Sequence, residues 1–152
     1  MKKTQFDLIN LPKKMIITAD ESILITYQGH DQSILDKKIE IIHQQPHLHS
    51  DILVKVVLFA AAKINLQVIV RVAQGAKETN TFLKIQVLLI GKQAEAKIIP
   101  ALEIMENSVK AGHAAIISRI NAEQLFYLQS RGLTLQAAEK QIIKGFLSDP
   151  VK

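Results

Sequence analysis

Two segments of this sequence alternate apolar and mostly polar residues with the period of a β-strand. In "INLQVIVRV" the apolar positions are Ile64, Leu66, Val68, Val70 and Val72. In "FLKIQVLLI" they are Leu83, Ile85, Val87 and Leu89. Because successive side chains of a strand point to opposite faces, each set lies on one face of a sheet. We therefore expect a core built from the apolar faces of sheets.

Further β-branched runs extend this strand-like pattern from Lys14 to about Ile104: "MIITA", "ILITY", "IEIIH", "ILVKVVLF" and "AKIIPALEI". The runs recur about every fifteen to eighteen residues, which is wider than the spacing of about 8–12 residues typical of sandwiches. No long helical pattern lies between them, which argues against βαβ units. A meander, a sandwich and a solenoid of stacked coils all fit this pattern.

After Ile120 the pattern becomes helical. In "NAEQLFYLQSRG" Asn121 is the expected N-cap, Gln124 completes a capping box, and Gly132 is suited to the position after the helix end. A second helix follows in "TLQAAEKQIIKGFLSDP", with Thr134 as its N-cap. Its apolar stripe consists of Leu135, Ala138, Ile142 and Phe146. The chain therefore divides into a β-rich part, residues 1–120, and a helical hairpin, residues 121–152, within one compact unit.

Composition restricts the function classes. The 152 residues contain no cysteine, which excludes disulfides, thiolate metal ligands and a cysteine nucleophile in this chain. The net charge of +5 comes from dispersed lysines without interleaved aromatic residues, so we expect no nucleic-acid partner. The chain shows neither a secretory signal nor an apolar run long enough to span a membrane, and a cytoplasmic location is expected.

Histidines are the main candidates for chemistry. His47 and His49 in "HQQPHLHS" would share one face of an extended segment, as in a cupin metal site, but no glutamate follows as a third ligand. His113 in "VKAGHAAIISRI" has no acid, cysteine or second histidine beside it, and on chemistry alone it is typical of a core histidine. Nucleotide-binding and hydrolase motifs are absent, so no enzyme and no catalytic residue is predicted.

Three segments in fixed order carry a family resemblance. They are "IHQQPHLHSDILVKVVL", "AQGAKETNTFLKIQVLLIGKQAEAKIIPALEI" and "SVKAGHAAIISRINAEQLFYLQSRGLTLQAAEKQIIKGFL". Together, over about residues 43–147, they resemble the carboxy-terminal part of the SufB/SufD family of iron–sulfur cluster assembly proteins. The chain looks like a miniature member, for which residues 1–42 carry no assigned role.

The resemblance implies a right-handed parallel β-helix followed by carboxy-terminal helices. It also implies two partners: a SufC-type ABC ATPase that docks on the helices, and a SufB-like subunit or a second copy that pairs with the β-helix. His113 stands in place of the SufD histidine at the interfacial cluster site. Its neighbours Gly112 and Ala114 resemble the SufD side, while Ala111 replaces a frequent cysteine.

The expected function is thus a SufD-like scaffold subunit. A transient iron–sulfur cluster would require ligands from a partner, because this chain has no thiolate. The partner-docking residues are expected to be Phe126, Tyr127, Arg131, Gly132 and Phe146. Three alternatives remain: a structural homodimer without cluster chemistry, a small cupin-like metal protein that uses His47 and His49, and a nucleic-acid-binding protein.

Overall fold

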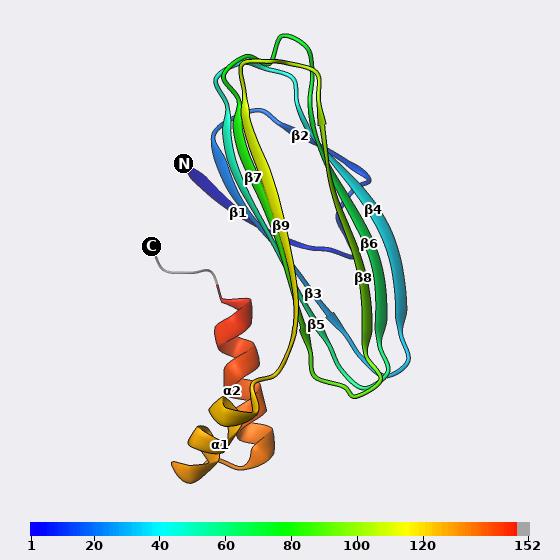
Figure 1. Cartoon of the computed structure of the whole chain (residues 1–152), viewed down its shortest axis with the longest axis vertical. Helices are drawn as coiled ribbons and strands as arrows, with labels where there is room; N and C mark the ends of the chain where they lie inside the picture. Colours follow the sequence, from blue (N-terminus) through cyan, green and yellow to red (C-terminus); the bar gives the residue numbers. More distant parts are fainter. Residues whose placement is uncertain (149–152) are drawn as a thin grey trace.

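The computed structural model describes residues 1–148, so the last four residues of the expected hairpin lie outside the described part. Within these described residues, nine strands precede two helices, and Figure 1 shows how they are arranged. The elements are β1 (Lys2–Asp7), β2 (Lys14–Ile17), β3 (Glu21–Gly29), β4 (Ile34–His43), β5 (His49–Leu58), β6 (Lys63–Val72), β7 (Asn80–Leu89), β8 (Glu95–Ile104), β9 (Lys110–Arg119), α1 (Ala122–Ser130) and α2 (Leu135–Leu147).

The strands form two parallel sheets that face each other. The five-stranded sheet has the order β1-β3-β5-β7-β9 and the four-stranded sheet has the order β2-β4-β6-β8. Each strand from β1 to β7 therefore pairs with the strand two places further along the chain, and each coil contributes one strand to each sheet. This arrangement is a β-solenoid, as the resemblance implied, and it eliminates the meander and the sandwich.

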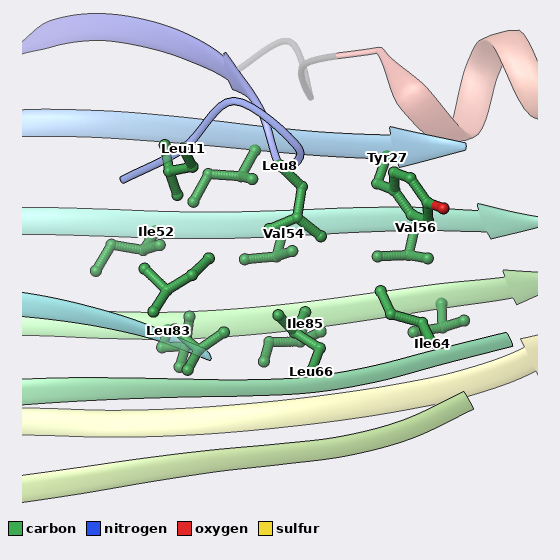
Figure 2. Packing of buried hydrophobic residues seen from close by; sticks show 14 of the residues in the cluster. Leu8, Leu11, Tyr27, Ile52, Val54, Val56, Ile64, Leu66, Leu83 and Ile85 are labelled. Atoms are coloured by element: carbon green, nitrogen blue, oxygen red, sulfur yellow. The ribbon is translucent and has the colours of Figure 1, made fainter. Parts of the chain in front are cut away.

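Consecutive coils stack in register. Ile23 pairs with Ile52, Ile52 with Leu83, and Leu83 with His113, so one coil takes about thirty residues. Because paired residues in a parallel sheet point to the same side, the alternating apolar positions stack into rows that fill the space between the sheets. Figure 2 shows part of this aliphatic core, to which both sheets contribute, including Val54, Ile64, Leu66 and Ile85.

The core is closed at its first coil. The segment between β1 and β2 crosses diagonally from one sheet to the other (Figure 1) and buries Leu8 and Leu11 in the core cluster. The ammonium of Lys37 donates a hydrogen bond of 3.0 Å to the carbonyl oxygen of Ile9 in this segment. Buried apolar side chains thus cover this end of the solenoid, and the hydrogen bond from Lys37 holds the covering segment.

One buried polar group lies within the core. The imidazole Nε2 of His43 lies 2.8 Å from Ser50 Oγ, which lies 2.7 Å from Thr81 Oγ1. All three side chains are buried. Burial lowers the pKa of His43 from its ordinary value of 6.5, and an interaction with the backbone of Arg71 offsets part of this change. His43 is therefore held neutral and bridges the two sheets.

Both helices begin at the N-caps that the sequence predicts, Asn121 and Thr134, and the chain turns between them at Gly132. The Asn121 side chain accepts hydrogen bonds from the backbone N–H groups of Glu123 and Gln124, and Thr134 Oγ1 accepts one from Ala137. Gly132, at φ 96°, lies in the left-handed region that favours glycine. The N–H of Gly132 donates to Gln129 and that of Leu133 to Leu128, which together form a Schellman motif.

Helix α2 rests on the outer face of the five-stranded sheet. There Val57 and Leu88 are buried although their side chains point away from the core. The Lys55 ammonium lies 5.7 Å from the centre of the Phe146 ring and donates a hydrogen bond of 2.5 Å to the carbonyl oxygen of Ser148. A cation at this position stabilises the carboxyl end of a helix, so Lys55 fixes the end of α2 to the sheet.

The apolar pattern misses the first and the last strand, since it placed strands only between Lys14 and Ile104. β1 is rich in polar residues, and β9 contains Gly112 and several alanines in place of β-branched residues. Both are held by their pairing with β3 and β7 rather than by intrinsic strand preference. In the described part of the chain, neither helix has the length and apolar character needed to cross a membrane.

Candidate functional site

The solenoid ends on two strands that each have only one neighbour, β8 beside β6 and β9 beside β7. Their inward-facing side chains continue the core rows but have no further coil above them. Ile98 and Leu102 on β8 are only partly buried, and Ile117 on β9 is 45% exposed. We call this surface the open end. It exposes the cross-section of an apolar core, in contrast to the end covered by Leu8 and Leu11.

The two edges of the open end differ in their backbone donors. The N–H groups of Lys110 and Ile120 donate toward β7, so the alternate residues of β9 direct theirs to the free edge. These alternate residues are Ala111, His113, Ala115, Ile117 and Arg119. On β8 the corresponding free-edge set includes Pro100, which has no N–H. The edge of β9 is therefore continuous, whereas the edge of β8 is interrupted in its middle.

His113 lies on β9, at the open end. It pairs with Leu83 and so belongs to an inward-facing row, yet its imidazole is exposed because no coil follows β9. Among residues 1–148, no side chain forms a hydrogen bond or ion pair with this imidazole. The interpretation of His113 as a satisfied core histidine does not fit this position. An exposed imidazole in an apolar surround is available to a group outside the chain.

Residues 18–146 match the family described as "SUF system FeS cluster assembly, SufBD core domain". The match covers the solenoid from β3 to β9 and nearly all of the helical hairpin, and it leaves out β1 and β2. The chain belongs to the SufBD family. The SufBD match begins some twenty-five residues before the resemblance found from the motifs, so β3 and most of β4 are also part of the family core.

Curated SufBD relatives support this assignment. An iron-sulfur cluster assembly SufBD family protein of Mycobacterium tuberculosis is 30% identical over 132 residues, which are 87% of this chain and 16% of the relative. The iron-sulfur cluster assembly protein SufD of Escherichia coli is 34% identical over 116 residues, 76% of this chain and 27% of SufD. The chain thus spans roughly a sixth to a quarter of the length of these relatives.

The other histidine pair does not lie beside His113, since His49 begins β5, two strands away from β9 in the sheet. His47 has a φ of 60° in the turn before β5, so the extended run that would align it with His49 is broken. His47 Nδ1 lies 3.0 Å from Glu78 Oε2, and His49 Nε2 lies 3.4 Å from Asp51 Oδ2. Over residues 1–148, no group of three or more histidines and carboxylates could hold a metal ion. Nothing in this arrangement supports the cupin-like alternative.

The hairpin presents most of the expected docking residues on one exposed surface. Phe126 and Tyr127 on α1 are 74% and 57% exposed, and the guanidinium of Arg131 lies 5.7 Å from the centre of the Tyr127 ring. Gly132 forms the adjoining turn. Phe146 on α2 is half-buried against Lys55, and it lines one cavity together with Tyr127. We call Phe126, Tyr127 and Arg131 the hairpin surface.

Several features of the site are not evident from the sequence. Pro100 interrupts the row of backbone donors on β8 because its nitrogen, which carries no hydrogen, points to a free edge. Which edge is free depends on the order of the strands in the sheet. The exposure of Ile117 likewise depends on β9 being the last strand. A proline inside a run of apolar residues is a signal for an edge strand, and it could have identified β8 as one.

Proposed function

We propose that this SufBD-family protein is a SufD-like scaffold subunit in iron–sulfur cluster assembly, which pairs through its open end and docks an ABC-type ATPase through its hairpin surface. The observation that carries the proposal is the position of His113 at the open end of a SufBD core. Within residues 1–148, this is the one place where an imidazole meets both an uncovered apolar core and a free strand edge.

The open end supports pairing with another β-solenoid. Its partly exposed apolar side chains would be buried by a second solenoid, and burial of apolar surface is the main driving force for such association. The continuous edge of β9 offers backbone donors and acceptors, whereas Pro100 removes a donor from the middle of the β8 edge. We therefore expect the five-stranded sheet to continue into the partner and the four-stranded sheet to end at β8.

A nascent cluster would be the cargo of this interface. This chain offers an exposed imidazole nitrogen but no thiolate, because its sequence has no cysteine. Iron in clusters is held mainly by cysteine thiolates, with histidine as a known substitute. In this proposal a SufB-like partner supplies the thiolates and His113 supplies one nitrogen. The small neighbours Ala111 and Ala115 on the same edge leave room for close approach.

The hairpin surface supports the docking of a protein. Phe126 and Tyr127 are large, exposed and aromatic, and Arg131 lies beside them. Aromatic residues and arginine dominate the binding energy of protein interfaces. The cap at Asn121 and the turn at Gly132 hold these side chains on a fixed scaffold. By analogy with the family, the occupant would be a SufC-type ATPase.

Co-purification with the cognate ATPase tests the docking claim. Phe126→Asp and Tyr127→Asp are expected to weaken binding at least tenfold, since buried aromatic anchors are worth about 2 kcal/mol or more. Ile34→Asp is the matched control, because Ile34 is 76% exposed at the start of β4, outside the hairpin. If the intact protein does not bind the ATPase, or both hairpin variants bind as well as Ile34→Asp does, docking through this surface is wrong.

Reconstitution separates the scaffold from the structural homodimer that has lost cluster chemistry. Iron and sulfide are added to the protein with and without a cysteine-bearing SufB-like partner, and the cluster is followed by its visible absorption. The scaffold proposal predicts a cluster only in the mixture, with a lower yield for His113→Ala. If His113→Ala behaves like the unaltered protein in every mixture, the structural homodimer is the better description.

A further inference from the structure

A trough lies on the outer face of the five-stranded sheet, on the side of the solenoid away from its core. Its volume is about 400 Å³, and it is lined by residues of β1, β3, β5 and β7. No residue of α1 or α2 lines it, so the helix that covers Val57 and Leu88 leaves this part of the sheet open. The volume falls within the range of about 300–1,000 Å³ typical of small-molecule sites.

The trough follows from the lengths of the outward-facing side chains. Ser22 and Leu24 on β3, with Leu53 on β5, form a low and partly apolar floor. Longer side chains stand on either side, Gln5 on β1 and Phe82 with Lys84 on β7. Because neighbouring strands lie about 4.8 Å apart, these walls are separated by about 14 Å, which is wide enough for an aromatic ring to lie flat on the floor.

Phe82 forms an aromatic wall that is 44% exposed. Its ring lies against Gly112 on β9, where an added Cβ would come within 3.0 Å of the ring atoms Cδ2 and Cε2. The Phe82 ring therefore occupies space that a side chain at position 112 would need. A large aromatic side chain exposed beside an apolar floor offers a surface on which another ring can stack.

Lys84 adds a positive charge next to this ring. Its side chain is half-buried, and no residue of the described chain, 1–148, forms a hydrogen bond or ion pair with its ammonium. The one carboxylate that lines the trough, that of Asp51, lies 3.4 Å from the imidazole of His49. An ammonium in a half-buried apolar setting is stabilised by an anion of suitable shape.

We propose that this trough binds a small aromatic anion, with its ring on Phe82 and Leu53 and its anionic group on Lys84. The inference does not depend on the role in cluster assembly, because the trough faces away from the core, whereas His113 points toward it. It adds a small-molecule site to a protein whose proposed partners are all macromolecules.

Fluorescence titration with anilinonaphthalene sulfonate tests the proposal, since this probe combines fused rings with one sulfonate. We expect a single site with a dissociation constant of about ten to a hundred micromolar. The neutral probe phenylnaphthylamine has the same rings without the sulfonate, and it should bind about three- to tenfold more weakly. Equal affinity for the two probes would overturn the role of Lys84.

Three variants locate the probe. Phe82→Ala should weaken binding of the sulfonate about tenfold, and Lys84→Gln should lower its affinity toward that of the neutral probe, with Lys3 as the remaining cation of the lining. Ser22→Tyr removes no proposed contact but fills the floor, and it should abolish binding. Phe126→Ala and Lys97→Gln are controls for an exposed aromatic residue and an exposed lysine elsewhere. Unchanged affinity in Phe82→Ala, or in a Ser22→Tyr protein with a normal melting temperature, would overturn the site.

Discussion

His113 on β9 pairs with Leu83 on β7 in one inward-facing row, but Leu83 is fully buried and His113 is exposed. Two neighbouring positions of the same row therefore lie in different environments, Leu83 in the core and His113 at the surface. Since only the position of the last strand separates the two environments, substitutions at these neighbouring sites should have very different effects on stability.

Leu83→Ala should lower the free energy of unfolding by about 2–5 kcal/mol, because it leaves a cavity in an aliphatic core. His113→Ala should change it by less than about 0.5 kcal/mol, because its imidazole is exposed and forms no hydrogen bond or ion pair within residues 1–148. Urea unfolding followed by circular dichroism measures both. If His113→Ala lowered the free energy of unfolding by more than about 2 kcal/mol, His113 would stabilise the fold and would not be a free ligand for an external group.

The open end gives a paired test of self-association. Ile116 and Ile117 are adjacent and about equally exposed, 47% and 45%, but Ile117 faces inward at the open end and Ile116 faces outward. Ile117→Asp should shift a dimer to monomer in sedimentation equilibrium, because it places a charge in the apolar contact. Ile116→Asp should leave the mass unchanged. A protein that is monomeric at all concentrations, or equal effects of both variants, would argue against pairing through this end.

His43 should make stability depend on pH. Its pKa is lowered by burial, so at pH values below 6.5 the unfolded chain binds more protons than the folded one. The free energy of unfolding should therefore fall as the pH drops through 6.5, with a slope of up to about 1.4 kcal/mol per pH unit from this group. His43→Gln removes this contribution, so the difference between the two proteins in urea midpoint between pH 8 and pH 5.5 isolates it. Parallel curves for the two proteins would contradict the assignment.

Lys55 should fix the carboxyl end of α2. Lys55→Met keeps the length of the side chain but removes the donor to Ser148 and the charge beside Phe146. Hydrogen exchange of amides in residues 143–148 should speed up about tenfold or more, since a charged hydrogen bond contributes about 1.5–3 kcal/mol. Lys84→Met on the neighbouring strand β7 is the control, because it does not touch α2. Equal protection in both variants would show that apolar packing alone holds the helix.

Much of this fold could be predicted from local signals. The alternation of Ile64 to Val72 and of Leu83 to Leu89 gave the strands and their core faces, because period two is imposed by backbone geometry. The caps at Asn121 and Thr134 and the turn at Gly132 were equally local, since each satisfies backbone groups within a few residues. In these places propensity and tertiary structure agree.

Pairing partners and exposure could not be predicted in this way. An alternating strand gives its faces but not its neighbour, so the sequence pattern alone could not exclude a meander, and family resemblance was needed. His43 shows the same limit, because its burial depends on Ser50 and Thr81 from two later strands. The trough depends on side chains from four strands, and Lys84 and Gln5 do not stand out locally.

The unequal ends of the solenoid restrict what it can build. Head-to-tail stacking, the geometry of a fibre, needs two exposed ends that fit each other, and here Leu8 and Leu11 occupy one of them. A second copy joined through β9 would leave its own covered end facing outward, with no exposed apolar end to bind a third copy. In a pair joined as proposed, the assembly would stop growing at two solenoids, because Leu8, Leu11 and Lys37 leave no second apolar end open to a further copy.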